Sequence, residues 1–248
     1  MNDHPSVMLL EELSLNAYPG VSQLHYDGWA LQVSPGRWRR ANSVQILGPS
    51  SRPLDEKINY CEAFYTARGK RTIFKLTRES APELEPLLEA RGYERDADTS
   101  VQIRALEAAE PFAAYPDVTV QLDLTDDYAE AFYSIHDFDA ATHAPWQAIQ
   151  RNILPRTGYF GLWSDGEIVA SAIGVVERGW LGVFGVGTLS TVQRRGYALR
   201  IMRAMMAWGI EQNASYSYLQ VMRNNPAALA LYERLGYHEF YGYWYRQK

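Results

Sequence analysis

The chain has 248 residues and a formal net charge of −5, and it is 47% hydrophobic, 21% charged and 13% aromatic. These proportions exclude wholesale disorder, and the acidic balance argues against a nucleic-acid partner, which needs a basic face. The single cysteine, Cys61, excludes an internal disulfide and any structural zinc site built from several thiolates. We therefore expect no metal and a reducing compartment.

The sequence predicts no membrane segment. Its start has no Lys or Arg before a short apolar stretch, so it does not match a secretory signal. No apolar run approaches the roughly 18 residues that a spanning helix needs. We expect a cytoplasmic protein with no membrane partner.

A domain boundary is expected at residues 105–116, which contain two prolines and several small residues but no strand pattern. This linker separates an N-terminal unit, residues 1–104, from a C-terminal unit, residues 117–248. Each unit is long enough to build its own core.

Strand and helix patterns alternate along the C-terminal unit. Strands are predicted at residues 118–122, 158–163, 168–176, 181–189, 216–221 and 240–245. Helices are predicted from the cap residue Thr125 towards His136, at 146–153, from near Gly196, and from Pro226 to the residue before Gly236. This alternation indicates a mixed α/β sheet.

The strand at 181–189 and the loop after it form the most informative segment. Gly185 and Gly187 weaken ladder pairing and predict a bulge, which exposes backbone groups to an extended ligand arm. The loop at 193–198 reads Gln-Arg-Arg-Gly-Tyr-Ala and enters a helix. Backbone N–H groups, the helix dipole and two arginines make this an anion site shaped for a pyrophosphate, which Gly196 allows to approach closely.

The two halves of the chain resemble each other at an offset near 144 residues. The matched positions are Gly92 with Gly236, Pro82 with Pro226, Asp27-Gly28 with Asp165-Gly166, and Trp38 with Trp180. A duplication predicts the same fold in both halves. The alternative is a chance likeness between two α/β segments.

These motifs resemble those of the GNAT acetyltransferase superfamily. Gln193, Gly196 and Ala198 match its signature [Arg/Gln]-x-x-Gly-x-[Gly/Ala], and the segment from Asn225 to Tyr237 resembles its second motif, Asn-x-x-Ala-x-x-Leu-Tyr followed by Gly and an aromatic residue. The elements of residues 118–245 stand in family order. The resemblance implies an α/β (α+β) fold with two GNAT-like mixed-sheet domains in tandem, of which the C-terminal one is complete.

The resemblance also implies an activity and a set of site residues. The protein would be an N-acetyltransferase that moves an acetyl group from acetyl-CoA, its co-substrate, to a primary amine of a small molecule or peptide by direct attack. Tyr232 would be the catalytic residue that protonates the leaving thiolate. The cofactor-binding residues would be Val186, Gly187, Thr188, Gln193, Arg194, Arg195, Gly196, Tyr197, Ala198 and Asn225.

Structural alternatives stand beside these roles. Asn225 could serve only as a helix cap, Tyr232 as a core residue, and the two arginines as solvated surface. The strand at 181–189 lacks the glutamate that many relatives use as a base, so the general base stays open. The candidates are His136, Asp137, Asp139, His143 and Glu177.

The first half keeps the structural positions of the repeat but not the chemical ones. At the repeat offset, Asn225 and Tyr232 fall on Ala81 and Leu88. We infer a degenerate GNAT-like domain without a cofactor. A cleft between the halves would form the acceptor pocket, rimmed by Tyr241, Tyr243 and Tyr245 or Trp244.

Three further residues, Arg37, Arg39 and Arg40, form either a solvated edge or a contact for an acidic ligand. Two other functions compete with the enzyme. One is a non-catalytic acyl-CoA-binding module that docks a partner through its degenerate half. The other is an interaction protein that binds no CoA.

Overall fold

The computed structural model describes residues 5–80, 82–107 and 111–248. Over these residues the α-helices are α1 (Val7–Ala17), α2 (Leu54–Thr66), α3 (Leu84–Ala90), α4 (Asp126–Ile135), α5 (Ala140–Gln150), α6 (Tyr197–Glu211) and α7 (Pro226–Arg234). Single 3-10 turns are η1 (Arg39–Ala41), η2 (Phe112–Ala114) and η3 (Ser190–Val192). The strands are β1 (Ser22–Tyr26), β2 (Trp29–Val33), β3 (Val44–Ile46), β4 (Ile73–Thr77), β5 (Glu94–Ala105), β6 (Val118–Gln121), β7 (Arg156–Ser164), β8 (Glu167–Glu177), β9 (Trp180–Thr188), β10 (Tyr216–Met222) and β11 (His238–Gln247).

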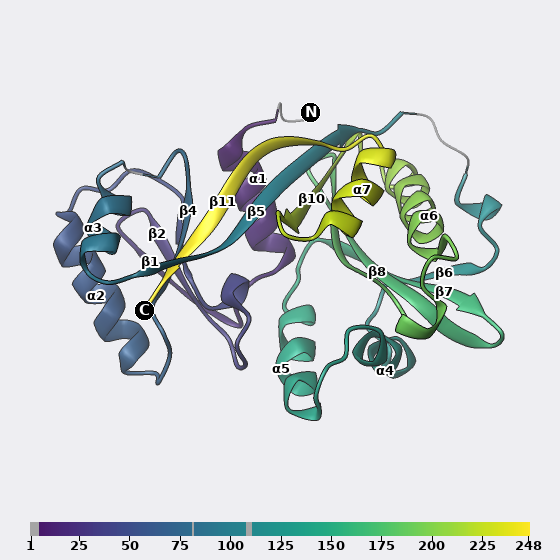
Figure 1. The fold of residues 1–248 in the computed structure, drawn as a ribbon, viewed down its shortest axis with the longest axis horizontal. Coiled ribbons are helices and arrows are strands. Elements are labelled where there is room, and N and C mark those ends of the chain that lie inside the picture. Colours follow the sequence, from purple (N-terminus) through teal and green to yellow (C-terminus); the bar gives the residue numbers. More distant parts are fainter. Residues whose placement is uncertain (1–4, 81, 108–110) are drawn as a thin grey trace.

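The described strands form one continuous sheet in the order β1-β2-β3-β4-β11-β5-β10-β9-β8-β7-β6 (Figure 1). The pairs β3–β4 and β9–β10 are parallel, and every other neighbouring pair is antiparallel. The mixed α/β fold expected from the sequence is confirmed.

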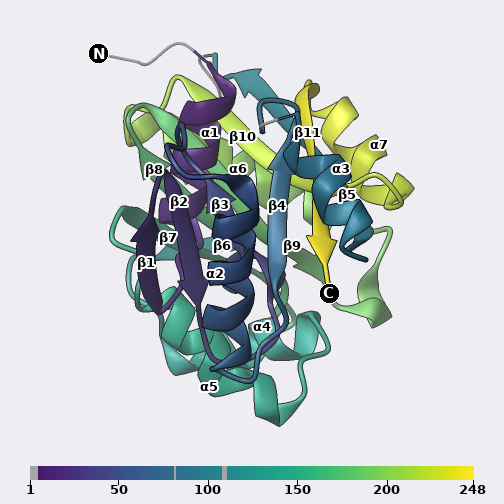
Figure 2. The same ribbon diagram turned by 90° about the vertical axis from the view of Figure 1, so that its left-hand side faces the viewer.

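The same order of elements occurs twice. A hairpin (β1–β2), β3, α2, β4, α3 and β5 in the first half correspond to a hairpin (β7–β8), β9, α6, β10, α7 and β11 in the second. Figure 2 shows α2 lying over one face of the strands of the first half. The helices α3 and α7 are both followed by a glycine in the left-handed region, Gly92 (φ 82°) and Gly236 (φ 80°). The expected internal repeat is therefore visible in the topology.

One matched pair of the repeat is wrong. Trp180 is the first residue of β9, whereas Trp38 lies in the loop after β2, before η1. The aromatic residue alone suggested the match, and the intervening loop differs in length between the halves.

The last strand joins the two halves. β11 lies between β4 and β5, and β5 pairs on its other edge with β10. The expected linker, residues 105–116, contains the end of β5 and η2, and its residues 108–110 lie outside the described residues. The division into residues 1–104 and 117–248 stays a prediction.

Helices cover opposite faces of the C-terminal part of the sheet. On β8, Ile173 packs in the same buried cluster as Phe132 of α4. The next residue, Gly174, faces α6, where a Cβ would lie 3.1 Å from the sulfur of Met205. Because neighbouring strand residues point to opposite faces, α4 and α6 lie on opposite sides of β8.

The helix expected at residues 146–153 is α5, which starts and ends earlier, at Ala140–Gln150. Pro145 lies inside it, where its missing N–H removes one backbone hydrogen bond of the helix. Burial of Trp146, whose ring stacks on Phe132 with centroids 4.4 Å apart, offsets the lost backbone bond. None of the described helices is long and apolar enough to cross a membrane.

Candidate active site

The parallel strands β9 and β10 separate halfway along their length. Their register runs from Trp180 opposite Tyr216 to Val183 opposite Leu219, while both strands continue beyond these positions. There the register of β9 against β8 shifts, and Gly185 adopts a φ of 54°. The bulge expected from the glycines is confirmed, and the β10-facing edge of β9 is left without its partner strand.

The first turn of α6 lies just beyond this strand. Gly196 occupies the cap position in the left-handed conformation (φ 82°), and no side chain caps the helix. A Cβ at Gly196 would meet no atom within 4 Å, and the exposed residues Gln193, Arg194 and Arg195 precede it. Uncapped N–H groups at a helix start form a site for an anion.

The remaining expected cofactor residues lie around the same region. Val186, Gly187 and Thr188 are half-buried at the end of β9, and the buried hydroxyl oxygen of Thr188 has no hydrogen-bond partner among the described residues. Tyr197 and Ala198 open α6. Asn225 caps α7, because its Oδ1 accepts a hydrogen bond from the N–H of Ala228 (3.1 Å).

Tyr232 lies on α7, in the buried cluster on the α6 side of the sheet. Its ring packs edge-on against Tyr237, with centroids 6.0 Å apart. Burial raises the pKa of the Tyr232 phenol to about 12, so the hydroxyl keeps its proton at neutral pH.

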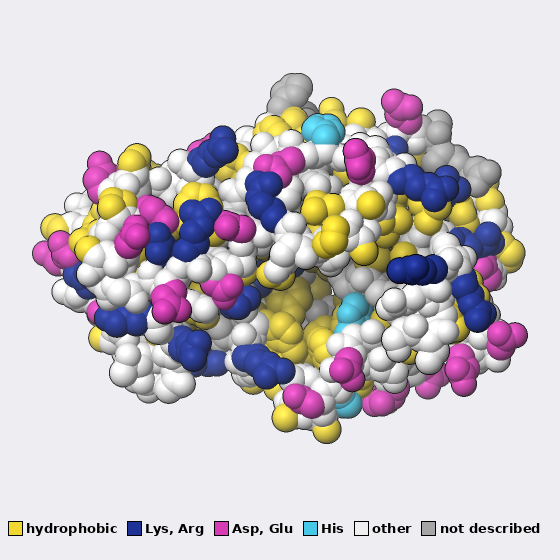
Figure 3. All heavy atoms as spheres, viewed as in Figure 1, with side chains coloured by type: hydrophobic (Ala, Val, Ile, Leu, Met, Phe, Trp, Pro, Cys, Tyr) yellow, Lys and Arg dark blue, Asp and Glu magenta, His cyan; other side chains and the backbone are white. Residues whose placement is uncertain are grey.

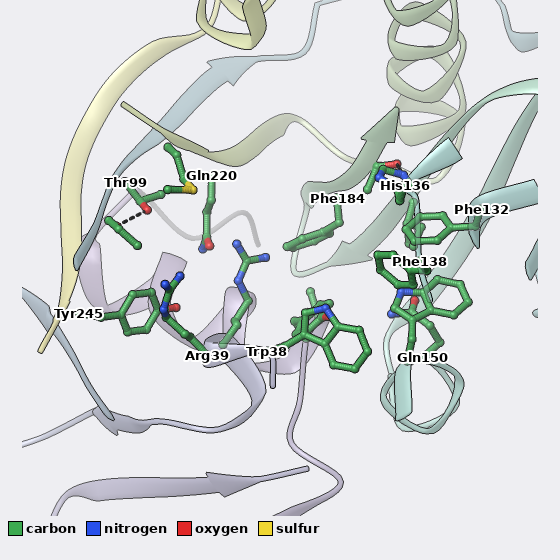
Figure 4. A pocket seen from close by; sticks show the side chains of 18 of the residues that line it. Trp38, Arg39, Thr99, Phe132, His136, Phe138, Gln150, Phe184, Gln220 and Tyr245 are labelled. Atoms are coloured by element: carbon green, nitrogen blue, oxygen red, sulfur yellow. Dashed lines mark hydrogen bonds between the residues drawn. The ribbon is translucent and has the colours of Figure 1, made fainter. Parts of the chain in front are cut away.

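A cavity of about 310 Å³ lies on the α4 side of the sheet, where β9 and β10 separate (Figure 4). Phe184 and Gly185 of β9 and Gln220 and Met222 of β10 line it. In the space-filling view, it is a hollow between the two halves with a largely hydrophobic floor and Lys, Arg and His side chains near its rim (Figure 3).

The N-terminal half builds one wall of this cavity. Trp38, Arg39 and Arg40 from the loop after β2 line it, and β11 adds Tyr243 and Tyr245. A cleft between the halves rimmed by these two tyrosines agrees with the sequence expectation. The other two expected aromatic residues lie elsewhere: the Tyr241 hydroxyl donates to Glu11 (2.5 Å) and the Trp244 indole N–H donates to Glu85 (2.8 Å).

His136 reaches the cavity from the end of α4. Its Nε2 lies 3.2 Å from the carbonyl oxygen of Gly185 and 3.3 Å from Oγ of Ser171. Because a carbonyl only accepts hydrogen bonds, we assign the proton to Nε2, which leaves Nδ1 as a base. Burial lowers the pKa of His136, an effect that the hydrogen bond to Gly185 only partly opposes, so the ring is neutral at pH 7.

The fit of His136 explains one of the glycines. A Cβ at Gly187 would lie 2.7 Å from Cε1 of His136, a separation that folded proteins do not show. Gly187 thus gives the imidazole room beside the bulge.

The other expected base candidates do not line the cavity. Asp137 and Asp139 are exposed, and His143 stacks on Tyr133 with ring centroids 3.6 Å apart. Glu177 accepts hydrogen bonds from Asn16 (3.0 and 3.1 Å) at the opposite end of β9. Of the five candidates, the structure brings only His136 to the cavity.

The structure places the three arginines near the start of the chain in three different surroundings. Arg37 is solvated, with 85% of its side chain exposed, and Arg39 forms an ion pair with Asp96. Arg40 points among aromatic rings of the cavity. Sequence reasoning missed Gln150 and Gln220 as cavity residues, because no local motif marks side chains that only the tertiary fold brings together.

In the described part of the chain, no group of three or more His, Cys, Asp or Glu side chains could hold a metal ion. The uncapped helix start, the unpaired strand edge and the unpartnered Thr188 hydroxyl fit an extended ligand with anionic groups, as acetyl-CoA is.

Comparisons with known proteins agree with this architecture. An uncharacterized N-acetyltransferase of Bacillus subtilis (strain 168), YobR, is 22% identical over 243 residues, which are 96% of this chain and 97% of that protein. A GCN5-related N-acetyltransferase from Kribbella flavida superposes with a TM-score of 0.71 at 16% identity, covering 99% of this chain and 96% of its own. A tandem GNAT protein from the clavulanic acid biosynthesis pathway gives a TM-score of 0.64 at 11% identity, covering 98% and 88%. The two solved structures show a shared fold, and the second suggests the tandem arrangement.

A family profile matches nearly the whole chain, residues 6–246, and its description is "Probable histone acetyltransferase Rv0428c C-terminal". The match spans both halves, and it favours an enzyme over a non-catalytic binding module. GNAT acetyltransferases use acetyl-CoA as the acetyl donor. The chain belongs to this family and is a GNAT-type acetyltransferase.

Proposed function

We propose that the protein transfers the acetyl group of acetyl-CoA to a primary amine of a small molecule or peptide by direct attack. The observation that carries this proposal is the arrangement around the separated strands β9 and β10. The uncapped start of α6 lies near one face, and the cavity with His136 lies on the other. A thioester held between the strands would be open to an amine from the cavity.

The co-substrate is held by backbone groups in this proposal. The N–H groups of residues 193–198 bind the pyrophosphate, with Arg194 and Arg195 beside them, and residues 186–188 bind the pantetheine arm together with Asn225. Exposed N–H groups at a helix start and an unpaired strand edge support these assignments.

His136 acts as the general base. The amine nitrogen attacks the thioester carbonyl carbon while Nδ1 of His136 accepts a proton from that nitrogen, and a strand N–H holds the oxyanion that forms. The C–S bond then breaks, which completes the amide and releases the CoA thiolate. A neutral imidazole at pH 7 meets the requirement for a base, and burial keeps it in that form.

Tyr232 stabilises the departing sulfur. With its pKa near 12, it is a weaker acid than a thiol, whose ordinary pKa is about 8.5. We therefore assign Tyr232 the role of hydrogen-bond donor to the developing thiolate, and the released thiolate takes its proton from solvent. This modifies the full proton transfer that the sequence resemblance implies.

Release of CoA thiol in the presence of a panel of primary amines tests the proposal, with Gly196→Glu as the disabling variant. A carboxylate at the start of α6 repels the pyrophosphate, so turnover and acetyl-CoA binding are expected to be abolished. Gly196→Gln is the matched control, because it carries the same left-handed backbone strain without the charge. Equal turnover in Gly196→Glu and the control would contradict the assigned site.

A further inference from the structure

Arg40 lines the cavity among aromatic rings. Its guanidinium carbon lies 5.4 Å from the ring centroid of Tyr18 and 5.6 Å from that of Phe184. Among the described residues, no Asp or Glu oxygen comes within the 4.0 Å of a salt bridge to it. Removing a cation from water without a counter-charge is costly, so the site favours an anion that completes the pair.

The Arg40 guanidinium has the Tyr243 hydroxyl as a hydrogen-bond partner but no carboxylate among the described residues that line the cavity. No Asp, Glu or Lys is among the described residues that line the cavity, although the chain as a whole has a net charge of −5. The neighbouring Arg39 is already neutralised by Asp96. Among the described residues that line the cavity, Arg40 is therefore the cation that no carboxylate neutralises, and His136 is neutral.

Hydrogen bonds fix the surroundings of this charge. The Tyr243 hydroxyl, which lies beside the Arg40 guanidinium, donates to Oε1 of Gln220 (3.0 Å). Nε2 of Gln220 donates in turn to Oγ of Ser14 (2.6 Å). This chain orders the wall around the guanidinium before any ligand binds.

Gln150 supplies a second polar group to the cavity. Gln150 of α5 is 2% exposed and lines the cavity, and its Oε1 accepts no hydrogen bond from any described residue. A buried carbonyl oxygen of this kind is complementary to an N–H donor on a ligand. The cavity thus offers a cation for an anionic group and an acceptor for an amine.

We propose that the acceptor is a small apolar molecule that carries both a primary amine and a carboxylate, such as an apolar or aromatic amino acid. Its carboxylate pairs with Arg40, its amine lies near His136, and its apolar body packs on Phe184 and Trp38. This proposal rests on the acetyltransferase function proposed above.

Charge and size select this class over others. A single guanidinium forms a two-pronged pair with one carboxylate, whereas a phosphate monoester carries nearly two negative charges. A cavity of about 310 Å³ is at the small end of ligand sites. A lysine-rich histone tail would bring further positive charge against Arg40, so we do not transfer the histone substrate in the family description to this chain.

Matched pairs of acceptors that differ only in the carboxylate provide the test. The pairs are L-phenylalanine with 2-phenylethylamine and L-leucine with 3-methylbutylamine, and kcat/KM is corrected for the fraction of neutral amine. We expect the amino acid to be preferred roughly 10- to 100-fold in each pair, as the loss of a charge-assisted hydrogen-bonded pair implies.

Arg40→Gln should remove this preference by raising KM for the amino acids much more than KM for the two plain amines. Arg40→Lys keeps the charge without the planar fork, and it should retain part of the preference. Arg37→Gln, in the same loop but solvated, is the matched control and should change neither value. Thermal unfolding with L-phenylalanine alone gives a readout independent of turnover.

Three results separate the two proposals. If acetyl-CoA binds but plain amines or a lysine-rich histone peptide are acetylated as efficiently as the amino acids, the carboxylate site is overturned. The proposed acetyltransferase function would stand in that case. The absence of both binding and acetylation for every amino acid of the pairs at millimolar concentration also overturns the carboxylate site. Failure of acetyl-CoA itself to bind the wild-type protein would instead overturn the proposed function.

Discussion

The two halves of the molecule differ in what binds the backbone N–H groups at the start of their equivalent helices, α2 and α6. Before α2 begins, the N–H groups of Ser51 and Arg52 donate to the carboxylate of Asp27 (both 3.0 Å), which belongs to the turn between β1 and β2. The side-chain hydrogen bond from Ser51, followed by these backbone bonds, holds the pKa of Asp27 well below its usual range. The first half thus fills its own anion position with a carboxylate, which the buried Lys57 also contacts (3.3 Å).

The second half leaves that position open. The equivalent turn residue, Asp165, accepts a hydrogen bond from Oγ of Ser164 (3.2 Å), and within the described residues it forms none with residues 193–198. In the described part of the chain, no side chain caps the start of α6, so no described carboxylate occupies this position. The turn aspartate thus decides whether the N–H groups before the helix stabilise the fold, as with Asp27, or stay available to a ligand, as with Asp165.

The strands and final helices of the two halves show the same contrast. β3 pairs with β2 in unbroken register, whereas β9 carries the bulge that brings Gly185 against His136. Leu88 of α3 is fully buried where the repeat places Tyr232 in α7. The other compared position, Ala81, lies outside the described residues. These differences support the inference that only the second half binds a cofactor.

Removing the base beside the bulge should have the largest effect on the chemical step. We expect His136→Asn to lower kcat about 100-fold or more, because positioned general bases contribute 10²- to 10⁴-fold. His143→Asn, which alters a nearby histidine that does not line the cavity, is the control. Steady-state rates of thiol release measure both, and equal rates for His136→Asn and wild type would remove His136 from the mechanism.

Tyr232→Phe removes the hydroxyl from α7, as the equivalent helix α3 has none at Leu88. We expect kcat to fall about tenfold, the value of one hydrogen bond to a charged group. The affinity for acetyl-CoA should change little, because Phe fills the same buried space. Isothermal titration beside kinetics separates the two quantities, and a parallel loss of both would return Tyr232 to a core role.

Asp27→Asn should destabilise the first half. It removes the negative charge that accepts hydrogen bonds from the N–H groups of Ser51 and Arg52 and pairs with Lys57. We expect a lower thermal midpoint, measured by circular dichroism, with acetyl-CoA affinity retained. Asp165→Asn, at the equivalent turn, should leave the midpoint nearly unchanged. A midpoint as low for Asp165→Asn as for Asp27→Asn would erase the contrast between the halves.

The pH dependence of stability should show the smallest effect. The pKa of His136 is lower in the folded protein than its ordinary value of about 6.5 in the unfolded chain. As the pH falls below about 6.5, the unfolded chain takes up this proton first, so stability decreases. Urea unfolding between pH 7.5 and pH 5 should show a flatter profile for His136→Asn. A profile as steep as that of wild type would show that His136 is not perturbed.

Local patterns predicted much of this fold but little of its assembly. Caps and turns marked α7 at Asn225, α6 at Gly196 and the bulge at Gly185, because each depends on neighbouring residues. The insertion of β11 between β4 and β5 left no local signal, because pairing partners are chosen by the tertiary fold.

The candidate site divides in the same way. The motif residues at the start of α6 and the end of β9 are contiguous, so their grouping could be predicted. Arg40, Gln150 and Phe184 come from segments far apart in sequence and meet only in the folded cavity. The sequence offered Arg40 as an acidic-ligand contact or a solvated residue, and its half-buried position among aromatic rings follows only from the tertiary fold.

Isothermal titration of acetyl-CoA into the wild-type protein and Gly196→Glu tests the contrast between the halves most directly. We expect one binding site per chain in the wild type and none in the variant, because Asp27 occupies the equivalent position of the first half. Two acetyl-CoA sites in the wild type would overturn the contrast between the halves. So would one site that persists in Gly196→Glu with the same affinity as in Gly196→Gln.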